Sequence, residues 1–237
     1  MKTISGSQLR FCILPSANPP AEMKALHDNC FRLWMDVWSE TFRKLNFDTS
    51  RLVDDFIRQD LIACIADGDM PVAIHLYSFY AADSEAARAH SYLNGNYPEL
   101  YFARLKKQKV RSLMSMEYLT VHPDWRKGKS NVHFAIVLVG LALKTLRAYG
   151  ADAAIAPARR DHKVHDLAYA FGGEPVIENV LNHNVACDLL MCHRDRVIPH
   201  ANPEVNELVN SLWQTRKFYP NYELQPEDNI LPLRKAA

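Results

Sequence analysis

Apolar residues recur along this chain with two periods, and the period predicts which segments are helices and which are strands. In residues 26–45 they are spaced by three and four positions, which predicts a helix with a wide, aromatic-rich buried face. A shorter helix is predicted over residues 50–58. Compact apolar runs at residues 9–14, 61–66 and 72–80 predict strands, and an Asp-Gly turn joins the last two into a hairpin.

The middle of the chain contains a long segment with a different pattern. Residues 83–110 carry two helical patterns separated by Asn94-Gly95-Asn96, and we expect them to form a helical insertion between two strands. Residues 113–121 then predict a central strand that ends before Pro123. Residues 131–149 are apolar on nearly every side of a helix, so we expect a buried helix there.

The remaining pattern completes the fold class. We expect a strand at 153–156, a helix at 163–171, strands at 175–180 and 185–192, and a helix at 203–218. Together these elements predict an α/β (α+β) fold with a mixed, mostly antiparallel central sheet flanked by helices, and with the insertion before the central strand. We expect one domain over residues 1–200, on which a C-terminal helix and extended tail, residues 201–237, pack.

Composition narrows the classes of function. The chain has 237 residues and 28 Lys+Arg against 27 Asp+Glu, and this net charge of +1 argues against a nucleic-acid-binding protein. Its longest apolar run, residues 134–143, is about half the roughly 20 residues needed for a membrane span. The five cysteines form an odd set without a CxxC pair, so we expect reduced core thiols in a cytoplasmic protein and no metal site. We expect a monomer or a homodimer.

The strongest functional signal is an anion-binding pattern. It lies between the end of the central strand and the start of the buried helix. Backbone N–H groups at a strand-to-helix turn bind anions, helped by the positive end of the helix dipole. The turn adds cations suited to a pyrophosphate and a glycine that permits close approach, while Ser130 or Asn131 can cap the helix. The residues of this candidate loop are Arg126, Lys127, Gly128, Lys129, Ser130 and Asn131. Exposed strand-to-helix turns are also often basic without holding a ligand.

The order of elements between Met114 and Cys192 resembles the core of the GNAT acyltransferase superfamily. Residues 119–130, LTVHPDWRKGKS, resemble that family's acyl-CoA pyrophosphate loop, although Gly128 follows Arg126 by two positions where the family usually has three. Residues 166–173, DLAYAFGG, are similar to the family's later helix. The EYLTV stretch that begins at residue 117 is similar to a pattern of N-acyl amino acid synthases and autoinducer synthases, without their arginine between the glutamate and the strand end.

The resemblance implies a function and a donor site. It implies transfer of an acyl group from a pantetheine thioester, either acyl-CoA or an acyl carrier protein, to the amine of a small molecule such as an amino acid. It also implies that the backbone of Leu119, Thr120 and Val121 binds the donor together with the candidate loop. The alternative is a GNAT-like module that binds CoA or a partner without turnover.

Two side chains are candidate catalytic groups. Glu117 lies in an otherwise apolar strand, where a desolvated carboxylate suits a general base that acts through water. Its alternatives are a solvent-facing position or a pair with an arginine. Tyr169 lies four residues before Gly173, where the resemblance implies a tyrosine that protonates the leaving thiolate. A tyrosine at the rim of an amphipathic helix also packs there without any chemical role.

Other residues have weaker signals. Lys106, Lys107, Lys109 and Arg111 suit a CoA phosphate or an acidic carrier protein, or form a solvated helix end. Asp188 lies in an apolar run and needs a partner, either an amine substrate or a structural arginine. The aromatic residues of the insertion and of the first long helix either wall an acyl-chain pocket or fill an enlarged core. His162, His165 and Tyr169 share a helix face, but no third ligand at suitable spacing supports a metal.

Overall fold

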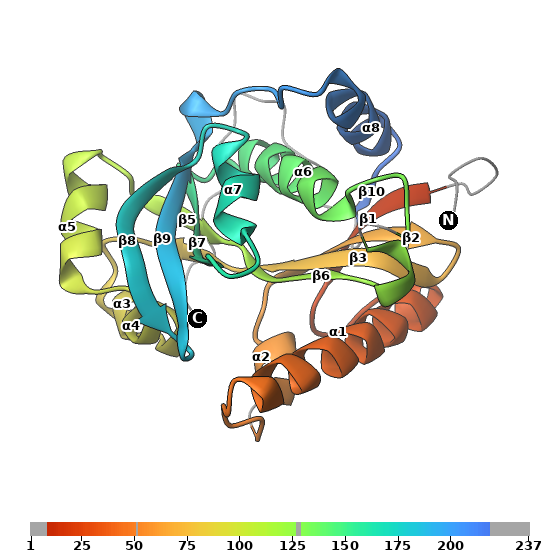
Figure 1. Ribbon diagram of the computed structural model, residues 1–237, viewed down its shortest axis with the longest axis horizontal. Coiled ribbons are helices and arrows are strands. Elements are labelled where there is room, and N and C mark those ends of the chain that lie inside the picture. The colour runs from red at the N-terminus through yellow and green to blue at the C-terminus, as the bar shows by residue number, and fades with distance from the viewer. Residues whose placement is uncertain (1–8, 51, 127–128, 219–237) are drawn as a thin grey trace. The chain divides into compact units, whose positions relative to one another are not determined.

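The computed structural model describes residues 9–50, 52–126 and 129–218 (Figure 1). Lys127 and Gly128 of the candidate loop and the tail from residue 219 onward lie outside the described residues. Contacts between residues divide the chain into two units. Among the described residues, the first unit is formed by residues 9–50, 52–77, 116–126, 129–142 and 200–218, and the second by residues 78–115 and 143–199.

The first unit is built on a five-stranded sheet in the order β10-β1-β2-β3-β6. Its strands are β1 (Leu9–Pro15), β2 (Leu61–Asp67), β3 (Met70–Tyr77), β6 (Glu117–Val121) and β10 (Lys217–Phe218). Neighbouring strands are antiparallel, except that β10 pairs in parallel with β1. The predicted Asp-Gly hairpin is confirmed as β2–β3, and Gly68 in its turn has a φ of +59°, which glycine adopts without strain.

Helices cover the sheet of the first unit. They are α1 (Lys24–Lys44), α2 (Leu52–Ile57) and α8 (Pro203–Gln214), with short 3-10 helices at Ala21–Met23 and Pro123–Trp125. Figure 1 shows α1 and α8 on opposite faces of the sheet. Because side chains alternate along a strand, Cys12 packs with Cys30 of α1, whereas Phe11 contacts Trp213 of α8 at a ring distance of 6.1 Å. All five cysteines are buried free thiols, as expected.

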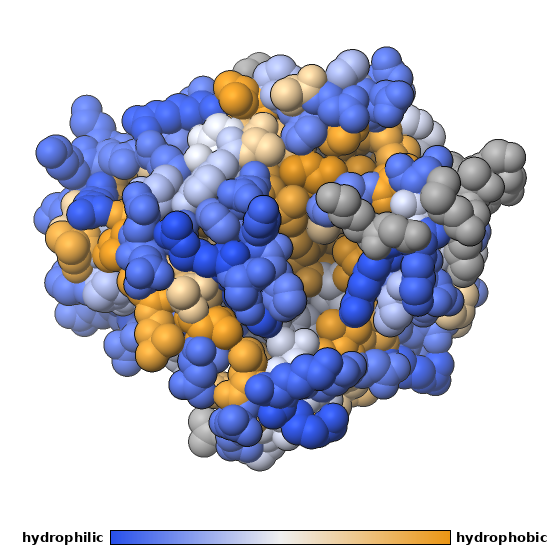
Figure 2. Space-filling model, viewed as in Figure 1, coloured by the Kyte–Doolittle hydropathy of each residue, from blue (hydrophilic) through white to orange (hydrophobic). Residues whose placement is uncertain are grey.

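The second unit has its own five-stranded sheet in the order β4-β5-β7-β9-β8. Its strands are β4 (Phe79–Ala81), β5 (Ser112–Ser115), β7 (Ala153–Arg159), β8 (Glu174–Asn182) and β9 (Val185–His193). Only the β5–β7 pair is parallel among the described strand pairs of this sheet. Leu181, near the end of β8, is 78% exposed, and Figure 2 shows apolar side chains gathered over this end of β8 and β9.

The predicted insertion forms three helices of the second unit. They are α3 (Glu85–Ala89), α4 (Ser91–Asn96) and α5 (Glu99–Lys107), and α7 (Val164–Tyr169) and the 3-10 helix Arg194–Arg196 follow later in the chain. The break expected at Asn94-Gly95-Asn96 is wrong, since these residues continue α4. The insertion lies between the antiparallel strands β4 and β5, as expected.

The central strand differs most from the sequence-based expectation. Residues 113–121 form two strands, β5 and β6, which belong to different sheets. The mixed, mostly antiparallel α/β architecture is confirmed, but its strands form two sheets instead of one. The predicted buried helix is α6 (Phe134–Ala148), which begins three residues later than expected. Among the described helices, none combines the length and apolar character needed to cross a membrane.

Gly173 allows the turn after α7 to pack closely, and we predict that Gly173→Ala destabilises the protein. A Cβ at this position would lie 2.8 Å from Cys192 Sγ and 2.9 Å from the Ala168 carbonyl oxygen. Such overpacking costs about 1–3 kcal/mol in the free energy of unfolding, measured by denaturant titration. Gly95→Ala is the control, because no atom lies within 4 Å of its Cβ and alanine favours a helix. Equal stability of the two variants would contradict the prediction.

Candidate functional site

A β-bulge interrupts β6. The register between β3 and β6 shifts between Ile74 and Leu76, so that the single residue His75 lies opposite Tyr118 and Leu119. The ladder pairs neither of these two β6 residues, and Tyr118 has a φ of +56°, in the left-handed region that tyrosine seldom adopts. The bulge therefore leaves two residues of β6 outside the ladder.

Side chains on both sides of the bulge hold its backbone. The hydroxyl of Thr120 donates a hydrogen bond to the carbonyl oxygen of Tyr118 at 2.7 Å. The indole N–H of Trp38, on α1, donates in turn to the Thr120 hydroxyl at 2.8 Å. This chain of hydrogen bonds connects the first long helix to the bulge.

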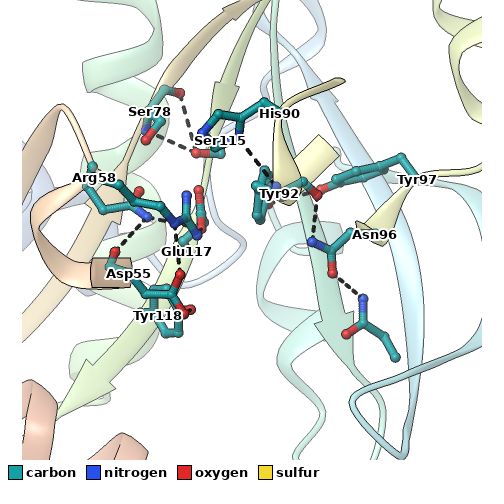
Figure 3. Close-up of polar contacts among 12 residues, drawn as sticks. Asp55, Arg58, Ser78, His90, Tyr92, Asn96, Tyr97, Ser115, Glu117 and Tyr118 are labelled. Carbon is teal, nitrogen blue, oxygen red and sulfur yellow. Dashed lines mark hydrogen bonds and ion pairs between the residues drawn. The ribbon is translucent and has the colours of Figure 1, made fainter. Parts of the chain in front are cut away.

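Glu117 is buried and paired with an arginine. Its Oε2 accepts hydrogen bonds from Arg58 Nη2 at 2.7 Å and from Gln59 Nε2 at 3.1 Å (Figure 3). Burial disfavours the charged form of Arg58, but the Glu117 and Asp55 carboxylates together outweigh this effect and raise the pKa of the guanidinium. Of the alternatives for Glu117, the structure thus shows the pair with an arginine.

Asp55 links the same arginine to the bulge. Arg58 Nε donates to Asp55 Oδ1 at 2.9 Å, and the Tyr118 hydroxyl donates to Asp55 Oδ2 at 2.9 Å. Burial, followed by the negative charge of Asp55, raises the pKa of the Tyr118 phenol. Figure 3 shows these side chains as one cluster beside β6, with Arg58 between the two carboxylates.

His75 presents a neutral ring opposite the bulge. Its side chain is buried, and burial lowers its pKa to about 3, so the imidazole carries no charge at neutral pH. Its Nδ1 lies 3.5 Å from the hydroxyl of Tyr77, two residues later on the same face of β3.

The candidate loop follows β6 directly. The guanidinium of Arg126 is anchored by a hydrogen bond from Nε to the Val121 carbonyl oxygen at 3.2 Å, and its side chain is exposed. The backbone N–H groups of Lys129 and Ser130 both donate to the Arg126 carbonyl oxygen, at 3.0 and 3.2 Å. Lys129 Nζ lies 3.8 Å from Asp124 Oδ1, both exposed. The loop therefore presents at least two exposed cations, Arg126 and Lys129, and its turn is held by hydrogen bonds to the Arg126 carbonyl oxygen.

The capping residue of α6 differs from expectation. His133 Nδ1 accepts a hydrogen bond from the backbone N–H of Ile136 at 3.3 Å, and α6 begins at Phe134. The expectation that Ser130 or Asn131 caps this helix is wrong, because Ser130 Oγ instead accepts from the Val132 N–H at 3.1 Å within the loop. The loop is therefore longer than the sequence pattern suggested.

Tyr169 and Asp188 form a separate cluster in the second unit. Asp188 is buried and accepts hydrogen bonds from Arg160 Nη1 at 2.7 Å, from the Asn179 N–H at 2.9 Å and from the Tyr169 hydroxyl at 2.7 Å. Burial alone would raise the pKa of Asp188, but these hydrogen bonds outweigh it and lower the pKa. Asp188 therefore pairs with an arginine, which was one of its two expected partners.

The hydroxyl proton of Tyr169 is held in the hydrogen bond to Asp188. Burial and the neighbouring Asp188 raise the pKa of the phenol, so it holds its proton more tightly than a free tyrosine does. His165, on the same helix face, packs edge-on against the tyrosine at a ring distance of 5.5 Å. Among the described residues, no group of three or more His, Cys, Asp or Glu is arranged to hold a metal ion.

The aromatic residues that were candidates for a pocket lie in the cores of the two units. Those of the insertion pack against β7, β8 and β9 in the second unit, where the buried members are Tyr92, Tyr97, Tyr101 and Phe102. Leu100 is 54% exposed and lines no core. Trp34 is fully buried in the first unit, and Trp38 packs at the edge of that core. The basic residues Lys106, Lys107, Lys109 and Arg111 are exposed at and after the end of α5.

Sequence reasoning missed the partners of the site. Asp55 and Arg58 are spaced by three positions on a predicted helix, which is a signal that they share a face. Nothing in that spacing shows that the face contacts a strand 59 residues later in the chain. His133 as a cap was equally hidden, because histidine is not among the residues that usually cap helices.

Comparison with known structures shows the fold. The chain superimposes on FeeM, an N-acyl amino acid synthase from uncultured soil microbes, with a TM-score of 0.55 and 11% sequence identity, over 81% of this chain and 93% of that one. It matches BjaI, a CoA-dependent acyl-homoserine lactone synthase, with a TM-score of 0.56 and 12% identity, over 89% and 93%. No protein-family model and no curated protein sequence matches the chain. The chain has a GNAT-like fold, which confirms the expectation from its sequence.

The Asp188 cluster yields a prediction on stability. Asp188→Asn removes a charge that three donors hold, and we expect it to lower the free energy of unfolding at pH 7 by about 1–3 kcal/mol. The folded-state pKa of Asp188 lies below its unfolded value. The charge therefore stabilises the fold above about pH 4, and this stabilisation is lost as the pH falls through the folded-state pKa. The difference between wild type and variant should therefore shrink in acid.

Denaturant titrations of both proteins at neutral and acidic pH provide the measurement. Asp195→Asn is the matched control, because Asp195 pairs with Arg194 on the surface, where an ion pair contributes little. A pH-independent loss of stability in Asp188→Asn would show that shape and not charge matters at this position.

Proposed function

We propose that this chain is an N-acyltransferase that moves an acyl group from a pantetheine thioester to the amine of a small molecule such as an amino acid. In the reaction the amine nitrogen forms a bond to the thioester carbonyl carbon, and the carbon–sulfur bond breaks. The ammonium loses a proton to a base, and the leaving thiolate gains one. A tetrahedral oxyanion lies between these two events and requires hydrogen-bond donors.

The observation that carries this proposal is the sequence of a bulged strand, a cationic loop and a buried helix. The bulge frees the peptide groups of Tyr118 and Leu119 from the ladder, and such N–H groups suit a thioester oxygen. The exposed cations Arg126 and Lys129 follow within a few residues, before the start of α6. Cations and the N-terminus of a helix suit a pyrophosphate.

The structural neighbours support the same class of reaction. One is named as an N-acyl amino acid synthase and the other as a CoA-dependent acyl-homoserine lactone synthase, described with SAM and isopentyl-CoA. Either acyl-CoA or an acyl carrier protein can present the pantetheine thioester in this proposal. The exposed lysines at the end of α5 support an acidic carrier, while the cationic loop suits CoA. Five reduced cysteines favour a cytoplasmic protein.

Glu117 is the proposed general base. In this role Arg58 and Gln59 hold the carboxylate in a fixed position. A carboxylate that is 3% exposed reaches the ammonium of an acceptor through a bridging water.

The acid role of Tyr169 stays a prediction. Its hydroxyl donates to Asp188, so a phenolate formed by proton transfer would lie beside a carboxylate. That arrangement makes Tyr169 a weaker acid than an isolated phenol.

Binding of the donor is the first test of this function. We expect CoA and acyl-CoA to bind with an affinity that falls as salt is added, because charged groups hold the pyrophosphate. Arg126→Ala should raise the Kd about tenfold, equivalent to about 1.4 kcal/mol, when measured by calorimetry. Arg32→Ala is the control, since Arg32 is exposed on α1 and donates a hydrogen bond to Asn29 of the same helix. An unchanged Kd in Arg126→Ala would remove the loop from the donor site.

Turnover is the second test, measured as thiol release with acyl donors of several chain lengths and pooled amine acceptors. We expect Glu117→Gln to lower kcat about 100-fold or more, with the donor Kd close to that of the wild type. Glu174→Gln is the control, because Glu174 pairs with Arg196 at an exposed position. Unchanged turnover in a folded Glu117→Gln protein would make the glutamate structural. Donor binding without thiol release from any donor would favour the non-catalytic module.

A further inference from the structure

We propose that Asp55 of α2 and Arg58, which directly follows this helix, are positioning residues that set the conformation of the β6 bulge, and through it the direction of the Leu119 N–H. The proposal rests on the acyl transfer proposed above. It adds a role for the aspartate of a short helix, for the arginine that follows this helix and for the tyrosine of the bulge.

The bulge needs an external constraint because its backbone conformation is unfavourable for its sequence. Tyr118 adopts a φ of +56°, where the Cβ of a non-glycine residue crowds the backbone. A conformation of this kind persists only where surrounding contacts determine it. The side chain of Tyr118 is therefore the first place to look for those contacts.

The hydroxyl of Tyr118 is fixed by a charged pair. It donates to Asp55 Oδ2 at 2.9 Å, and Asp55 Oδ1 accepts from Arg58 Nε at 2.9 Å. Arg58 continues to Glu117 through Nη2 at 2.7 Å. Two consecutive residues of β6, Glu117 and Tyr118, are thus bound by the end of α2 and the residue that follows it, immediately before Leu119.

The ring of Tyr118 is clamped as well. Trp34 and Trp38 of α1 contact it edge to face, with ring distances of 5.4 and 4.9 Å and interplanar angles of 82° and 86°. Trp38 also reaches the carbonyl oxygen of Tyr118 through the Thr120 hydroxyl. The ring, the hydroxyl and the carbonyl of this one residue are all held, so the peptide group that follows has a defined direction.

This network differs from one that only attaches a helix to a sheet. Contacts anywhere along the strand would be enough to attach a helix to it. Here the contacts are made to Glu117, which precedes the bulge, and to Tyr118, which belongs to it. Catalytic donors lose effect when they are displaced by about 1 Å, which costs up to about 100-fold in rate. Loss of the Tyr118 hydroxyl should therefore affect the chemical step more than the binding of the donor.

Tyr118→Phe and Asp55→Asn test the proposal, and both keep the size of the side chain. The first removes the donor hydroxyl, and the second leaves only one acceptor oxygen where Asp55 uses two, for Arg58 and for Tyr118. We expect each to lower kcat between tenfold and about 100-fold, with the Kd of CoA within about twofold of the wild type. Since the two residues act through one contact, the double variant should lose no more than the worse single variant. Tyr101→Phe is the control, because its buried hydroxyl also donates one hydrogen bond, to the Leu190 carbonyl oxygen in the second unit.

Amide hydrogen exchange provides a measurement that does not depend on activity. The amides of Thr120 and Val121, the β6 residues that pair with β3 directly after the bulge, should exchange faster in Tyr118→Phe than in the wild type, while those of α1 keep their rates. Unchanged exchange together with unchanged kcat would overturn the proposal, and so would additive losses in the double variant. If the wild-type protein transfers no acyl group, the proposed function fails, whereas faster exchange at Thr120 and Val121 in Tyr118→Phe would still support the positioning of the bulge.

Discussion

The carboxylate of Glu117, the first residue of β6, is only 3% exposed. A charge at such a buried position is tolerated because Arg58 and Gln59 bind it through hydrogen bonds. A buried charge that loses its partner costs about 3–5 kcal/mol, which is a large part of the stability of a typical domain. The ion pair therefore fixes α2 against the strand. The bulge lies within β6 directly after Glu117, and the cationic loop and the start of α6 follow this strand in the chain. The position of each therefore depends on this contact.

The period of apolar residues predicted most of the helices and strands, because burial on one face imposes that period locally. It could not show that residues 113–121 divide into strands of two sheets, since both halves are apolar and extended. The division depends on pairing partners, β7 for the first half and β3 for the second, which are distant in sequence. The turn at Asn94-Gly95-Asn96 was overestimated because tertiary packing of Leu93 and Tyr97 outweighs a weak local preference.

The sequence indicated which residues belong to the candidate site, but it did not show which side chains contact one another. A glutamate in an apolar strand indicates a special environment, and the sequence left an arginine partner open without showing which arginine it is. Tyr169 and Asp188 were each predicted to have a chemical role. Their direct hydrogen bond depends on the packing of α7 against β9, which no local sequence pattern shows. The cap of α6 was missed because His133 acts through a ring nitrogen at a position where shorter side chains usually serve.

The parallel pair between β1 and β10 has a consequence for the biosynthesis of the protein. Cys12 and Ile13 of β1 are partnered by Lys217 and Phe218, so this sheet edge stays open until the ribosome has added roughly 200 further residues. At usual rates of translation this interval lasts about 10–40 s. An unpaired strand edge is a template for association with other chains. The nascent chain therefore has its longest exposure to aggregation, and its greatest need of a chaperone, before α8 and β10 emerge.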